Sequence, residues 1–300
     1  MHKYLQAAGF SKLENERQIY DFIKHEVMRP EHLRDRASLA GGCSLLEYRY
    51  PVSPELGLCV GILDYGTGEG RVDYYYPYFD SEEISSNEIC SVERYTEREN
   101  YAGLIDEYKI GLSLIFFVTN PLAYRKLPDR EIQFDFRGTS LTAFCNQATV
   151  ILPVMKTEAD LEGMKDSRRE QETLIEAARN GDEEAIETLT ATDMDMYHQI
   201  SKRIENEDLY SVVEQSLMPS GIECDQYSII AEITAVDETE NSWSQEPIWL
   251  LGLSCNEVEF SAAVRKADLT GEPAVGRRLK GKIWLQGTVN FDRPVQEDEE

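Results

Sequence analysis

The last quarter of the chain decides the fold class, where residues 225–291 read DQYSIIAEITAVDETENSWSQEPIWLLGLSCNEVEFSAAVRKADLTGEPAVGRRLKGKIWLQGTVNF. Runs rich in β-branched and aromatic residues alternate here with turn-forming stretches, which predicts strands at 227–236, 248–254, 258–265 and 280–291. Short strands spaced by turns, with Gly281 and Gly287 inside the last one, favour a small barrel or a curved antiparallel sheet. We therefore expect a C-terminal β-rich domain over residues 223–293 and a disordered acidic tail over 294–300.

The first 156 residues are predicted to mix a helix with strands. Ser11 followed by Glu14 matches a capping box, which predicts a helix that begins there and ends before Pro30. Further apolar runs predict strands at 44–52, 56–63, 71–79, 111–119, 131–136, 141–145 and 149–155. The Gly-rich segment 66–70 is typical of a hairpin loop and not of a phosphate cradle, because no Gly-Lys-Ser/Thr and no helix follow it. Residues 1–156 are thus expected to form an N-terminal α+β domain.

Residues 157–222 are predicted to form an acidic helical segment. The stretch 157–221 carries 17 acidic against 6 basic residues, a net charge of −11. Asn180 and Gly181 interrupt the helical pattern, and Asp182 can cap the helix that follows, so a helical hairpin is expected. The second helix of this hairpin has an apolar stripe formed by Ile186, Leu189, Tyr197, Ile200 and Ile204. The whole chain is therefore predicted to be of the α+β class.

The net charge of the chain is −26, from 56 acidic and 30 basic side chains. This charge repels phosphate backbones and anionic lipid surfaces, which argues against nucleic acid or a membrane as a partner. It is read as an aid to solubility, and an acidic docking surface for a basic partner is the alternative. No apolar run approaches the ~20 residues that span a bilayer, and residues 1–13 lack the pattern of a secretory signal. We expect a soluble, cytoplasmic protein.

The cysteines and histidines form no strong metal or catalytic pattern. The six cysteines include no CxxC pair, so reduced thiols are expected at Cys43, Cys59, Cys90, Cys145, Cys224 and Cys255. Asp193, Asp195 and His198 are the best metal candidate, but helical spacing sets Asp193 apart from the other two and favours a solvated helix surface. No GxSxG or HExxH motif occurs. The sequence therefore predicts no catalytic residue, no metal and no cofactor.

An aromatic strand is the first candidate site. Tyr74, Tyr76 and Tyr78 alternate along the predicted strand 71–79, so their rings share one face of it. Such a face can line a ligand groove for a sugar, a peptide or a base. Aromatic residues also favour strands for packing alone, and a place in the core is the alternative.

A basic strip is the second candidate site. Between Ser261 and Leu285 the chain carries six basic and two acidic residues, a net charge of +4 within a chain of −26. Arg277, Arg278, Lys280 and Lys282 are the predicted partner-binding residues of this strip. The strip has three interpretations: it binds single-stranded nucleic acid or another anion, it docks on the acidic helical segment, or it pairs with neighbours in its own sheet.

Three stretches resemble a known family: MHKYLQAAGFSKL at 1–13, SLMPSGIECDQYSIIAEI at 216–233 and GEPAVGRRLKGKIWLQGTVNF at 271–291. They are similar to an uncharacterised family of intracellular proteins of similar length from clostridial gut bacteria, catalogued as a domain of unknown function. The resemblance covers nearly the whole chain. It implies a cytoplasmic bacterial setting and assigns no activity, cofactor or site residue.

The sequence leaves three functional hypotheses. The leading one is a non-enzymatic binding or regulatory protein whose partner is another protein, because the chain is well supplied with core residues and shows no catalytic pattern. The second is an enzyme of unrecognised type, in which Tyr74–Phe79 line a pocket and carboxylates act as general acid and base. The third is weak anion or nucleic-acid binding through the basic strip. The sequence leaves the oligomeric state open.

Overall fold

The structure is a computed structural model of the protein. It describes the following parts of the chain: residues 3–39, 42–66, 70–94, 100–107, 112–125, 136–154, 173–175, 177–178, 180–204, 208–220 and 225–291. The predicted acidic tail 294–300, most of the predicted strand 131–136 and Cys224 lie outside these residues.

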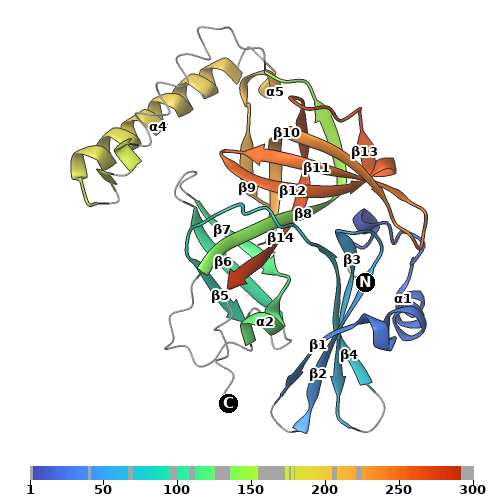
Figure 1. Ribbon diagram of the computed structural model, residues 1–300. Coiled ribbons are helices and arrows are strands. Elements are labelled where there is room, and N and C mark those ends of the chain that lie inside the picture. The colour runs from blue at the N-terminus through green and yellow to red at the C-terminus, as the bar shows by residue number, and fades with distance from the viewer. Residues whose placement is uncertain are drawn as a thin grey trace.

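Sheet A is formed by four antiparallel strands that follow one another along the chain. They are β1 (Leu33–Ser38), β2 (Ser44–Pro51), β3 (Leu56–Asp64) and β4 (Gly70–Phe79). Leu63 of β3 pairs with Arg71 of β4, so the hairpin predicted around the Gly-rich segment is confirmed. Sheet A lies beside the second sheet in the lower part of Figure 1.

Sheet B has ten strands among the described residues, and they lie between residues 90 and 291. They are β5 (Cys90–Arg94), β6 (Tyr101–Glu107), β7 (Leu112–Val118), β8 (Phe136–Ile151), β9 (Ser216–Pro219), β10 (Gln226–Glu240), β11 (Pro247–Cys255), β12 (Val258–Arg265), β13 (Leu269–Thr270) and β14 (Arg278–Phe291). Strands β8, β12, β11, β10 and β14 pair in a closed circuit, because β14 returns to pair with β8. Closure removes the exposed strand edges of these five strands over the paired stretch.

The closing strand β8 comes from the first half of the chain, and the other four strands of the barrel come from the last quarter. It runs parallel to β12, with Thr142 opposite Ser261, and antiparallel to β14. The α+β class is confirmed. The predicted domains 1–156, 157–222 and 223–293 stay a prediction. The barrel combines β8 from the first of them with four strands from the last.

Alternation along the barrel strands separates two apolar cores. Ile283 and Leu285 of β14 belong to the core inside the barrel, whereas Trp284 between them packs on the core shared with sheet A. Phe144 of β8 belongs to this outer core as well, and its ring stacks on Trp284 with centroids 6.4 Å apart. The barrel wall is therefore covered by protein on its sheet A side.

The described helices are short, with one exception. They are the 3₁₀ turn η1 (Gln6–Ala8), α1 (Glu16–Phe22) with a π-helical turn at Ile23–Val27, 3₁₀ turns at Pro30–His32 and Lys266–Asp268, α2 (Pro121–Arg125), α4 (Glu183–Ile204) and α5 (Leu209–Val212). No helix in the described ranges is long and apolar enough to cross a membrane.

The predicted start of the first helix is wrong. Asn15 caps α1, and its Oδ1 accepts a hydrogen bond from the backbone N–H of Gln18 at 3.0 Å. Ser11 instead donates from its N–H and its hydroxyl group to the carboxylate of Glu246. Ser11 does not cap the helix because it donates its hydrogen bonds to Glu246, a carboxylate distant in sequence.

The predicted helical hairpin stays a prediction, because residues 155–172, 176 and 179 lie outside the described residues, but the turn before its second helix is described. Gly181 adopts a φ of +85°, which favours glycine, and the carboxylate of Asp182 accepts hydrogen bonds from the N–H groups of Glu184 and Ala185 at 3.0 and 3.2 Å. The second helix, α4, extends away from both sheets, with its N-terminal end far from the barrel (Figure 1).

Candidate functional site

The three candidate tyrosines of β4 lie in the interior. Tyr74, Tyr76 and Tyr78, the tyrosine row, are 4%, 2% and 5% exposed and belong to the core shared by sheet A and the barrel wall. Two glycines of β3 make room for their rings. A Cβ at Gly61 would lie 2.4 Å from the Tyr74 ring, and one at Gly57 would lie 2.5 Å from the Tyr78 ring. The rings therefore lie across β3 at these glycines.

Charged residues of β2 lie under the tyrosine row. Arg49 is directly opposite Cys59 on β3, which in turn is opposite Tyr76 on β4. The Arg49 guanidinium binds Asp80 at 2.9 Å and donates to the carbonyl of Thr119 at 2.7 Å, and it lies 4.7 Å from the centroid of the Tyr78 ring. Because Thr119 directly follows β7, this arginine joins sheet A to sheet B.

Glu47 is the buried carboxylate of this junction, with 4% exposure. The Tyr74 hydroxyl group donates to its Oε2 at 3.3 Å, and the Nε of Arg49 lies 3.6 Å from its Oε1. Burial raises the pKa of Glu47, and the charge of Arg49 opposes that change. Burial also raises the pKa of Tyr74, Tyr76 and Cys59 well above their ordinary values, so all three keep their protons at neutral pH.

Side chains from the barrel complete the junction. The amide of Gln286 on β14, fully buried, donates to the carbonyl of Pro77 at 2.7 Å and accepts from the N–H of Phe79 at 3.2 Å. The Thr142 hydroxyl group of β8 donates to the Phe79 carbonyl at 2.9 Å. These side chains satisfy backbone groups at the end of β4 that no strand pairs in the described sheet.

The basic strip divides into a buried and an exposed part. Arg278 is 4% exposed, and its guanidinium donates to the carbonyls of Leu152, Tyr210 and Val213 at 2.6–2.9 Å. Desolvation lowers the pKa of Arg278 from its ordinary value. Arg277 donates to the carbonyl of Glu272 at 2.7 Å. Both arginines therefore bind the chain's own backbone, and Arg278 holds α5 and the segment after β8 against β14.

The lysines of the strip are exposed on the outer surface of the barrel. Lys280 and Lys282 are two residues apart on β14, so they share a face, and the ammonium group of Lys280 lies 4.2 Å from the centroid of the Tyr210 ring. Lys282 pairs with Ser228 of β10, which pairs with Met218 of β9, and Met218 is 58% exposed. We call Lys280, Lys282 and Met218 the lysine wall.

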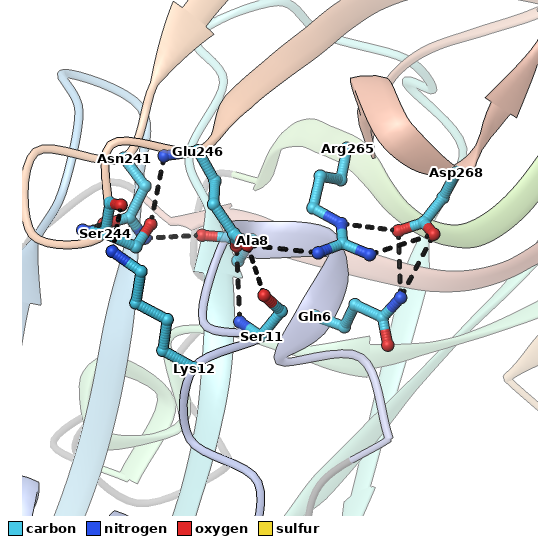
Figure 2. A network of polar contacts seen from close by, with 9 residues as sticks. All are labelled: Gln6, Ala8, Ser11, Lys12, Asn241, Ser244, Glu246, Arg265 and Asp268. Carbon is cyan, nitrogen blue, oxygen red and sulfur yellow. Dashed lines mark hydrogen bonds and ion pairs between the residues drawn. The ribbon is translucent and has the colours of Figure 1, made fainter.

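A third polar cluster, which the sequence did not indicate, fastens the N-terminal segment to the barrel (Figure 2). Arg265 of β12 binds both oxygens of Asp268 at 2.8 and 3.1 Å and an oxygen of Glu246 at 3.1 Å. Gln6 of η1 donates to Asp268, and Ser11 donates to Glu246. Each carboxylate thus joins Arg265 to a different residue of the N-terminal segment.

Asn241 continues this cluster in the loop between β10 and β11. Its amide donates to the carbonyl of Ala8 at 2.8 Å, and its Oδ1 accepts from two N–H groups of its own loop at 3.0 Å. Gly9 has a φ of +79°, and a Cβ there would lie 2.7 Å from that of Asn241. Lys12 donates to the carbonyl of Ser244 at 2.6 Å. The cluster satisfies its members internally, which indicates a structural role.

No group of three or more metal-ligating side chains occurs among the residues that the structure describes. Of the predicted metal candidates, Asp195 and His198 lie on the exposed surface of α4, and the side chain of Asp193 lies outside the description. The absence of a cofactor stays a prediction.

The fold and these sites define an α+β protein in which a closed five-stranded barrel carries a second, four-stranded sheet. Residues 5–287 match the family model described as "Domain of unknown function, E. rectale Gene description (DUF3881)", and the chain belongs to that family. The resemblance seen in the sequence is thereby confirmed. No curated protein and no solved structure matches the chain.

Proposed function

We propose that this is a non-enzymatic binding protein that contacts an acidic surface of a partner protein through the lysine wall. The observation that supports this most directly is the exposure of Lys280 and Lys282 on one face of β14, with an exposed Met218 two strands away on β9. The net charge of the chain is −26, so two exposed ammonium groups are a local exception to its negative electrostatic potential. The exposed methionine offers an adaptable apolar contact.

The lysine wall is better suited to a protein than to nucleic acid. Phosphate-backbone binding gains its free energy from many Lys and Arg contacts, and the strip's two arginines donate to the chain's own carbonyls. Exposed ion pairs contribute only ~0.2–1 kcal/mol each, so apolar burial at Met218 has to supply part of the affinity.

A cytoplasmic location belongs to this proposal. The five described cysteines are free: Cys43, Cys59, Cys90, Cys145 and Cys255. Free thiols are usual in compartments that keep them reduced. Burial raises the pKa of Cys145 to about 11 and that of Cys255 to about 12, so neither is a reactive thiolate at neutral pH.

The test is affinity capture from host lysate with the tagged protein and two variants of equal charge change. The first variant is K280E/K282E, and the control is R17E/K24E, which changes exposed residues of α1 and the turn after it. We expect a protein partner that the wild type and the control both retain and that K280E/K282E loses at least tenfold. Equal retention by all three forms would contradict the proposal.

An enzymatic function is the second candidate, and one observation favours it. Glu47 is a buried carboxyl group whose pKa is raised by desolvation and which accepts a hydrogen bond from Tyr74, a pairing that suits general acid catalysis. The packing of the tyrosine row in the core weighs against it, because a substrate must reach Glu47. A small-molecule screen by thermal shift tests it: a ligand that stabilises the wild type and not Glu47→Gln would support this candidate.

A further inference from the structure

The N-terminal end of α4 has the complementary chemistry to the lysine wall. Glu183 and Glu187 are exposed there, and Ile186 between them is 48% exposed. From Asp182 to Ile204 the chain has six acidic and two basic residues. We call Glu183, Ile186 and Glu187 the α4 tip. It combines an apolar side chain with two carboxylates, as the lysine wall combines Met218 on β9 with two ammonium groups on β14, two strands away.

The spacing of the carboxylates on the α4 tip also matches the spacing of the ammonium groups on the lysine wall. Residues four apart on an α-helix share a face and are separated by about 6 Å along its axis. Residues two apart on a β-strand share a face and are separated by about 6.7 Å. Glu183 and Glu187 can therefore face Lys280 and Lys282 together, one carboxylate for each ammonium group.

The α4 tip does not reach the lysine wall of its own chain. Arg278 holds α5 on the barrel, and α4 contacts α5 and extends from there over 22 residues, about 33 Å, with the tip at its far end (Figure 1). A second copy carries the same wall and the same tip. Every copy thus supplies both halves of the contact at equal concentration.

We infer that the α4 tip of one copy docks on the lysine wall of a second copy, so that the protein partner of the wall is this chain itself. This inference rests on the proposed function and names its partner. Glu183 and Glu187 pair with the two lysines, and Ile186 packs on Met218. When each copy docks its α4 tip on the lysine wall of the other, the two copies form a closed dimer in which both tips and both walls are occupied.

The net charge of −26 sets the conditions for this association. Two such chains repel at long range, but at ~0.1 M salt the Debye length is about 10 Å, so distant charges are screened while charges in contact still attract. Association is therefore expected at moderate salt and is expected to weaken at ~1 M salt, where the screening length falls to about 3 Å.

The test is sedimentation velocity of the full chain and of two charge-reversal variants, alone and mixed. The wild type is expected to dimerise as its concentration rises. K280E/K282E and E183K/E187K are each expected to remain monomeric, with at least a tenfold weaker association. Their equimolar mixture should form a heterodimer, because each tip then faces a wall of opposite charge.

The two variants change the net charge in opposite directions, to −30 and −22 from −26, so a general charge effect cannot weaken association in both. Recovery of association in the mixture also shows that each variant is folded. A wild type that stays monomeric at all concentrations, or variants that associate like the wild type, would overturn the inference. Partner capture lost in K280E/K282E with a monomeric wild type would leave the proposed function intact and remove only this inference.

Discussion

The tyrosine row of β4 and the lysine wall on β14 have the same sequence pattern and opposite places in the molecule. The tyrosines of the row and the two lysines of the wall each repeat one residue type at every second position, so each set occupies one face of its strand. The tyrosine row faces sheet B and is buried beside Glu47 and Arg49, whereas Lys280 and Lys282 face solvent. Alternation therefore identifies the residues that share a face, and the neighbouring layer decides whether that face is covered.

The largest effect that we predict is from Tyr76→Ala. This substitution removes a ring buried between the sheets and its hydrogen bond to the Thr119 carbonyl, and the free energy of unfolding should fall by about 3–5 kcal/mol. Lys282→Ala should change it by no more than about 0.5 kcal/mol, as is typical of surface positions. Urea denaturation of both variants measures the contrast. Similar losses in the two would contradict the assignment of buried and exposed faces.

Arg278→Ala should destabilise the protein by about 3 kcal/mol, because it leaves several backbone carbonyls without their donor. Lys282→Ala, four residues along the same strand, is the matched control. Hydrogen exchange of α5 should accelerate in Arg278→Ala and not in the control. Unchanged exchange in α5 would show that Arg278 does not hold this helix.

Gly61→Ala should lower the free energy of unfolding by about 1–3 kcal/mol, because its new Cβ meets the Tyr74 ring at 2.4 Å. Combining it with Tyr74→Leu should cost less than the sum of the two single losses, because the smaller side chain frees the space. A double-mutant cycle in urea measures this coupling. Strict additivity would contradict the contact between ring and glycine.

The smallest effect that we predict for a buried residue is from Glu47→Gln, and it depends on pH. The pKa of Glu47 is raised in the folded state above its ordinary 4.5, so its stabilising contribution is complete below that value and is lost as pH rises through the folded-state pKa. Glutamine undergoes no such loss. The variant should match the wild type at low pH and exceed it by up to about 1 kcal/mol at pH 8. A difference that does not change with pH would contradict the raised pKa.

Periodicity predicted the strands best where apolar residues were dense. The strands β2, β3, β4, β10, β11 and β12 appear close to their predicted positions. The runs 141–145 and 149–155 join into the single strand β8, because β14 pairs with it along nearly its whole length. The sequence analysis missed the strands β1, β5, β6, β9 and β13. The charged edge strand β1 and the short strand β9 are ordered by pairing with a neighbouring strand and not by their own composition.

The sites were harder to predict because burial depends on layers distant in sequence. Glu47 and Arg49 lie in a strand where charged residues normally indicate a solvent face, but the tyrosine row and Thr119, which follows β7, cover them. One signal was present: Gly57 and Gly61 bracket Cys59 at the period of the tyrosine row. For the basic strip, nothing local distinguished Arg278 from Lys280, because the carbonyls that bind Arg278 lie more than 60 residues away.

The most direct test of the account is amine acylation of the lysines, followed residue by residue with mass spectrometry at low and high protein concentration. We predict that Lys282 reacts as readily as Lys24 in dilute protein, because both are exposed. In concentrated protein, Lys282 but not Lys24 should become protected as the second copy docks. Protection of Lys282 at every dilution would show that its own chain covers the lysine wall. Equal reactivity of the two lysines at every concentration would show that no second copy binds there.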